Sequence, residues 1–194
     1  MTSKLIDICS AALMALGSAV IVGWLTRTEQ LVQVYPGLAP MQVNTALCVL
    51  LSGLALMAAN HHKARVAMQA AGLALLVGGL SLGEQLLAID LGLGHWLVEP
   101  FISDRTIAPG RMSPTTAISV IIGAAALFYQ ALRPRRQSKF PVVTFAGGLV
   151  VAFALTHLLN LAVDPAGIHS LHGMALHTII AFLILAVGLV SLVH

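Results

Sequence analysis

Six apolar runs, each about long enough to cross a bilayer, constrain this chain more than any other feature. A helix needs roughly 20 residues to span the hydrocarbon layer, and it satisfies its own backbone hydrogen bonds there. Only 9% of the 194 residues are charged, against about 25% in a typical soluble domain. We therefore predict an all-α integral membrane protein with six transmembrane helices in one domain, residues 1–194. The predicted spans are residues 5–25, 44–60, 66–89, 115–132, 141–163 and 173–193.

The basic residues are divided unequally between the two sides that these spans define. Seven of the ten Lys and Arg lie before the first span or in the second and fourth connections. Because cytoplasmic connections carry the excess of Lys and Arg, we expect both termini in the cytoplasm. We attribute the basic cluster to topology and lipid headgroup contact, and we expect no nucleic-acid partner. The seven residues are Lys4, Lys63, Arg65, Arg133, Arg135, Arg136 and Lys139.

A short pattern, Met-x-x-polar-Thr, precedes or opens every second span. It begins at Met41, Met112 and Met174. Its recurrence predicts three related helical hairpins packed around a pseudo-threefold axis. Helix capping explains the polar residues and the threonines, since such side chains satisfy free N–H groups at a helix start. Capping does not explain the repeated methionine.

Several polar side chains fall at membrane depth near the periplasmic ends of the spans. Ionisable groups there are functional candidates by default. One interpretation is an interhelical hydrogen-bond cluster. The other is a binding pocket for a signal, a metal or a cofactor. The candidate ligand-binding residues are Glu84, His157, Asn160, His177 and Asn44.

The third periplasmic connection adds histidines next to a methionine. Imidazole and thioether are ligands that Cu(I) accepts, so copper is one candidate cofactor. The spacing matches no standard zinc signature. Haem b held by His157 and His177 is another candidate, because helical bundles bind cofactors between facing helices. The candidate metal ligands are His169, His172, Met174 and His177, with Met41 and Met112 added if the threefold axis holds.

Three segments resemble a known kind of membrane domain. They are residues 40–48, residues 83–92 and the stretch that contains Pro109-Gly110-Arg111-Met112-Ser113-Pro114. They are similar to the N-terminal membrane sensor region of bacterial signalling proteins, which precedes PAS, histidine kinase or diguanylate cyclase modules. The resemblance covers roughly residues 20–130. It implies an input domain in the bacterial inner membrane whose effector lies C-terminal to this chain.

The three-hairpin layout is also similar to that of MHYT-type sensor domains, for which copper or gas binding has been proposed. The Met-His-Tyr-Thr motif of that family is missing from this chain. Only His172-Gly-Met174 resembles it. The resemblance therefore adds little to the case for a metal.

The leading hypothesis is a homodimeric sensory domain that detects a signal in a periplasmic-side pocket and passes it through the sixth helix. The first alternative is a haem- or copper-binding redox or sensor module, and the second is a small transporter. An enzyme acting on lipid is a third alternative. We expect no catalytic site, because the chain has no Walker loop, GxSxG, HExxH or GxGxxG motif in a suitable setting.

Overall fold

The computed structural model describes residues 2–34, 38–89, 91–94, 98, 101–102, 110–133, 142–163 and 174–193. Over these residues the chain forms seven helices and no strand. Six of the helices are long and apolar enough to cross a membrane, which confirms the predicted fold class. Each predicted span ends within three residues of the observed helix. The helices are α1 (Thr2–Thr26), α2 (Glu29–Val32), α3 (Val43–Asn60), α4 (Ala64–Leu86), α5 (Pro114–Leu132), α6 (Val142–Val163) and α7 (Leu176–Val193).

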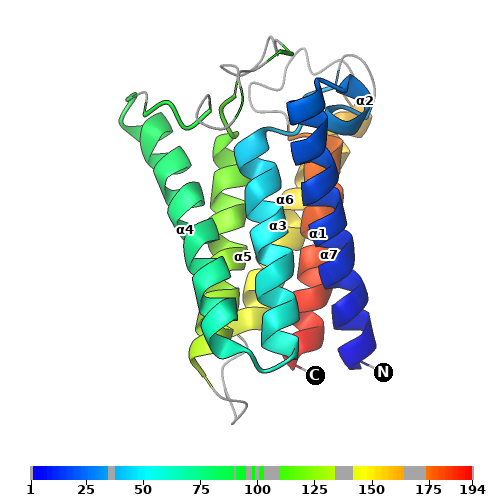
Figure 1. Ribbon diagram of the computed structural model, residues 1–194, viewed down its shortest axis with the longest axis vertical. Coiled ribbons are helices and arrows are strands. Elements are labelled where there is room, and N and C mark those ends of the chain that lie inside the picture. The colour runs from blue at the N-terminus through cyan, green and yellow to red at the C-terminus, as the bar shows by residue number, and fades with distance from the viewer. Residues whose placement is uncertain are drawn as a thin grey trace.

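The six long helices run side by side and give the bundle two distinct ends (Figure 1). At one end α1 begins, α7 ends and the turn at residues 61–63 joins α3 to α4. We call this the termini end. The opposite end carries the short helix α2, which the sequence did not predict, and residues 110–113 before α5. We call it the loop end.

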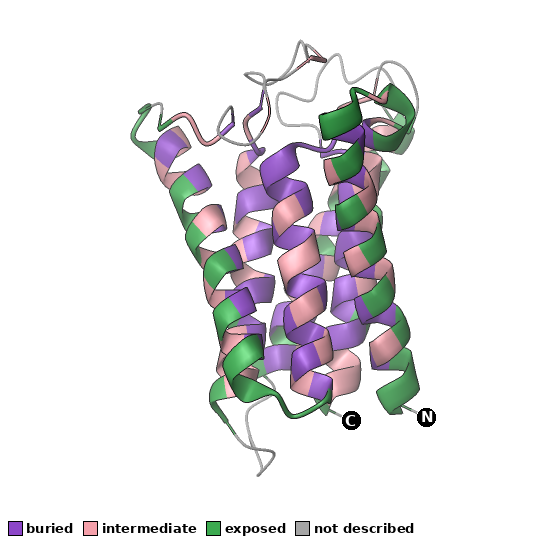
Figure 2. Ribbon diagram, in the orientation of Figure 1, coloured by how far each residue is buried: buried purple, intermediate pink, exposed green. Residues whose placement is uncertain are grey.

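The second helix of each hairpin lies at the centre of the bundle. The central helices α3, α5 and α7 all contact one another. Among the described residues, the peripheral helices α1, α4 and α6 make no contact with each other. Burial follows the same division (Figure 2): 67% of the apolar span is buried in α3 and 44% in α5 and α7, against 33% in α1 and α4 and 28% in α6. The three hairpins agree with the prediction, and the structure adds that the second helix of each one is central.

Glycines bring the two helices of the first hairpin into close contact. A Cβ on Gly17 of α1 would lie 2.7 Å from the carbonyl oxygen of Ala46 on α3. A Cβ on Gly53 of α3 would lie 2.9 Å from the carbonyl oxygen of Ser10 on α1. Small residues at such crossings let backbones approach, and van der Waals packing then stabilises the helix pair in lipid.

Candidate functional site

Buried polar side chains are concentrated at the loop end. Twelve polar or charged residues are buried within the described part of the chain. Nine of them lie within about two turns of the loop-end termini of α3, α4, α5 and α7. A buried polar group in a lipid-embedded bundle is stable only where it has hydrogen-bond partners. Polar contacts between helices should therefore be concentrated at this end. The nine are Gln42, Asn44, Thr45, Ser81, Glu84, Ser113, Thr116, Ser119 and Thr178.

The three repeated segments have equivalent places in the fold. Met41, Met112 and Met174 all lie directly before a central helix and are 1%, 1% and 7% exposed. The threonines of the pattern, at positions 45, 116 and 178, are buried in the first turns of α3, α5 and α7. The methionine side chains therefore join the apolar core at the loop end.

The methionine carbonyls provide a further reason for the pattern in two hairpins. The Trp24 indole N–H of α1 donates to the carbonyl oxygen of Met41 at 2.8 Å. The Gln85 amide of α4 donates to the carbonyl oxygen of Met112, also at 2.8 Å. In both hairpins the peripheral helix thus holds the segment that leads into its central partner. In the third hairpin, the residue at the position equivalent to Trp24 is His157 of α6. It lies 17 positions before Met174, as Trp24 lies 17 positions before Met41.

Glu84 stabilises the connection that follows α4. Its side chain is 3% exposed. Glu84 Oε1 accepts the backbone N–H groups of Leu91 at 2.8 Å and of Leu93 at 3.4 Å. A carboxylate so placed replaces the water that would otherwise solvate these amides, and such charge-assisted bonds are stronger than neutral ones. Glu84 therefore acts here on the chain's own backbone.

Three residues of the Pro-Gly-Arg-Met-Ser-Pro stretch, Gly110, Ser113 and Pro114, have clear structural roles. Gly110 has φ +81°, and a Cβ on it would lie 2.5 Å from the carbonyl oxygen of Gly94. Only glycine fits such a close approach in the left-handed region. Ser113 caps α5, since its Oγ accepts the Thr116 N–H at 3.2 Å and Pro114 occupies the first turn.

The remaining candidate ligand-binding residues share the loop end, but they are distributed over separate helices. Asn44 is 4% exposed at the start of α3, where its Oδ1 accepts the N–H of Thr45 at 2.8 Å. His177 is half-buried in the first turn of α7. On α6, His157 is half-buried and Asn160 is exposed. Because α6 and α4 do not touch over the described residues, His157 and Glu84 do not belong to one cluster.

Only part of the candidate metal set falls within the described chain. Met174 is buried and His177 half-buried, while His169 and His172 lie outside the described residues. The two histidines of the candidate haem site, His157 and His177, lie on α6 and α7, which are in contact. Where the structure describes the chain, it brings together no group of three or more His, Cys, Asp or Glu.

Sequence reasoning missed a polar network at the termini end. The Asn60 amide donates to Ser3 O and Ser3 Oγ at 3.1 Å and to Asp7 Oδ1 at 2.8 Å. His61 Nε2 lies 3.0 Å from the same oxygen of Asp7. The available signal was Asp7 itself, an acid in the first apolar run. This network joins the start of α1 to the end of α3.

The loop end contains further residues that the sequence did not single out. Gln42 Oε1 and Ser81 Oγ are buried and have no hydrogen-bond partner among the described residues. Buried polar atoms normally have a partner, so an unsatisfied one needs an explanation. Both atoms lie at the end of the bundle that holds most of the buried polar side chains.

Comparison of the chain with models of protein families, with curated proteins and with solved structures gives no match. The burial and contacts of the loop end are the basis for assigning a function.

Proposed function

We propose that this protein is a sensory input domain of a bacterial inner membrane, which binds a signal at the loop end. Buried polar groups are concentrated at the loop-end termini of α3, α4, α5 and α7, and this observation supports the proposal most directly. Binding pockets combine an apolar lining with a few convergent polar groups. Here the buried methionines supply the apolar part, and Asn44 and His177 are the polar groups we assign to the signal.

We also propose an orientation in the membrane, with the termini end in the cytoplasm. The termini end carries Lys4, Lys63, Arg65 and Arg133. Under the positive-inside rule it faces the cytoplasm, and the loop end then faces the periplasm. A signal from outside the cell would reach the loop end directly.

Helix α7 is the element we propose for transmission. It begins at the loop end, has His177 in its first turn and runs to the termini end. It contacts α1, α3, α5 and α6, and so touches all three hairpins. A ligand held between α3 and α7 would bind one arrangement of these helices better than another and so shift the population toward it. We propose that a cytoplasmic effector module C-terminal to α7, in a homodimer, reads this shift.

Alanine substitutions at the loop end test the proposal in the full-length protein. Asn44→Ala and His177→Ala are each expected to reduce signal-dependent output at least tenfold. The thermal unfolding midpoint in detergent should stay near the wild-type value for His177→Ala and fall slightly for Asn44→Ala, which leaves the Thr45 N–H without its acceptor. Thr156→Ala is the matched control, because Thr156 is exposed on α6 and its hydroxyl donates to Ala152 O within the same helix. Wild-type output from both Asn44→Ala and His177→Ala would overturn the assignment.

A further inference from the structure

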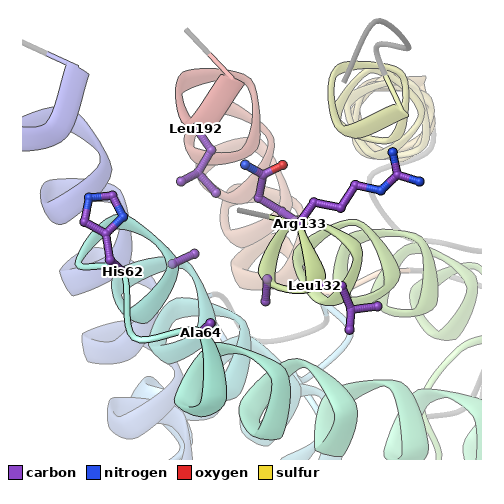
Figure 3. A pocket seen from close by; sticks show the side chains of 8 residues that line it. His62, Ala64, Leu132, Arg133 and Leu192 are labelled. Atoms are coloured by element: carbon purple, nitrogen blue, oxygen red, sulfur yellow. The ribbon is translucent and has the colours of Figure 1, made fainter. Parts of the chain in front are cut away.

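A cavity opens at the termini end, remote from the polar residues of the loop end. Its volume is about 530 Å³, within the range of small-molecule sites. It lies between the α3–α4 turn, the last turn of α5 and the last turn of α7 (Figure 3). These positions are the ends of predicted spans, so the cavity lies at the boundary between lipid and water. Its lining is Ala59, His62, Ala64, Gln130, Ala131, Leu132, Arg133 and Leu192.

The lining has a basic rim and an apolar wall. Arg133 supplies a positive charge, His62 and Gln130 supply polar groups, and none of the lining residues in the described part of the chain is acidic. The other five residues are alanine or leucine. A cavity of this kind suits a ligand with an anionic head and an apolar body.

Arg133 lines the rim, and its guanidinium points away from His62 (Figure 3). Its guanidinium carbon lies 4.7 Å above the centre of the Tyr129 ring, one turn earlier on α5. Among the described residues it forms no salt bridge. Stacking on an aromatic face uses the plane of the guanidinium and leaves its N–H groups free at the edge, where phosphate oxygens bind.

His62 occupies a backbone position that favours glycine. Its φ is +58°, and it ends α3 in a Schellman motif, in which His62 N–H donates to Ala59 O at 3.2 Å and Lys63 N–H to Ala58 O at 2.8 Å. A side chain is disfavoured at this position, and strain retained in a native structure points to a use for the residue. The histidine side chain here lines the cavity.

We propose that this cavity binds the phosphate of an anionic phospholipid, with Arg133 and His62 at the headgroup and the alanines and leucines along the glycerol and upper acyl chains. Basic pockets between helices at a membrane surface bind such headgroups. The lining comes from all three hairpins, through α3, through α4 and α5, and through α7. A bound lipid therefore bridges the last turn of α7 to the other two hairpins. This site does not depend on the proposed sensory function or on the orientation in the membrane.

Binding of short-chain phosphatidylglycerol to the full chain in neutral detergent, followed by native mass spectrometry, tests the proposal. Phosphatidylcholine of the same chain length is the zwitterionic comparison, and inorganic phosphate is the soluble one. We expect the wild-type protein to prefer phosphatidylglycerol. Arg133→Gln is expected to weaken that binding about fivefold, the effect of one basic residue near a lipid surface.

Two further variants distinguish lipid binding in this cavity from general attraction of the lipid to positive surface charge. Arg65→Gln removes an exposed positive charge nearby that does not line the cavity, and it should leave the affinity within about twofold of wild type. His62→Gly should weaken lipid binding and at the same time raise the thermal unfolding midpoint, because it relieves the left-handed strain. A purely structural role for His62 would not change the two quantities in opposite directions.

Equal binding of both lipids, or equal loss in Arg65→Gln and Arg133→Gln, would overturn the proposal. Competition by inorganic phosphate at millimolar concentration, lost in Arg133→Gln, would support the phosphate site and identify free phosphate as a second source of the same ligand chemistry.

Discussion

Side-chain hydrogen bonds reinforce the backbone bonds that hold the connections at the loop end, whereas main-chain bonds close the α3–α4 turn at the termini end. At the loop end Trp24 and Gln85 donate to the carbonyls of Met41 and Met112, and Glu84 accepts two backbone N–H groups. At the termini end the α3–α4 turn is closed by bonds between main-chain atoms. A connection that relies on side chains depends on a few residues, so single substitutions should lower stability most at the loop end.

Substitution of Trp24 should cause the largest loss of stability. Its side chain is 2% exposed, donates to Met41 and meets Phe101 edge to face at 5.1 Å. Trp24→Ala should lower the free energy of unfolding in detergent by about 3–5 kcal/mol, because it leaves a cavity and an unpaired carbonyl. The matched aromatic at the other end is Tyr129, half-buried under Arg133, and Tyr129→Ala should cost about 1 kcal/mol. Equal losses would remove the contrast between the two ends.

Substitution of Glu84 should cause the second-largest loss of stability. Glu84→Ala leaves the amides of Leu91 and Leu93 without their acceptor and should cost about 2–3 kcal/mol. Hydrogen exchange at these two amides should accelerate in the same variant. Glu84→Gln keeps an acceptor oxygen and should lose clearly less stability. Unchanged exchange in Glu84→Ala would show that the carboxylate does not hold this connection.

Asn60 tests the polar network at the termini end. Its amide is buried, but its partner Asp7 is 38% exposed at the side chain, so water can replace part of the interaction. Asn60→Ala should therefore cost about 1–2 kcal/mol, less than Glu84→Ala. Asp7→Asn keeps an acceptor oxygen at the same position and serves as the milder comparison. A loss at Asn60 greater than that at Glu84 would reverse the proposed order.

Substitution of Ser113 should cause the smallest loss of stability among these variants. Ser113→Ala removes the cap of α5 and should cost about 1 kcal/mol. Ser113→Asp, which keeps a good N-cap acceptor, should restore the stability. Thermal unfolding of the two variants side by side measures the capping contribution, and an equal loss in both would argue that packing, not capping, is responsible.

Much of the fold follows from the sequence because lipid imposes a simple rule on each span. Length and apolarity alone placed all six spans, and the Met-x-x-polar-Thr pattern indicated the three hairpins. These features are local, so a single sequence contains them.

The details of the candidate site do not follow in the same way. Glu84 was expected at the loop end, and it is there, but its partners Leu91 and Leu93 depend on how the connection turns back over α4. The bonds to the methionine carbonyls also join residues 17 and 27 positions apart. The termini-end cavity is assembled from α3, α4, α5 and α7. Such contacts depend on the path of the chain in space, which periodicity does not report.

The hairpin as the repeating unit has a consequence for how such a bundle can grow. Two spans return the chain to the side of the membrane from which it started. A tandem duplication of one hairpin therefore inserts with the same polarity as its parent, and every later segment keeps its side. Duplication of a single helix would invert everything that follows it. Parallel repeats built from an even number of spans are thus open to stepwise lengthening of the gene without any change in the distribution of basic residues.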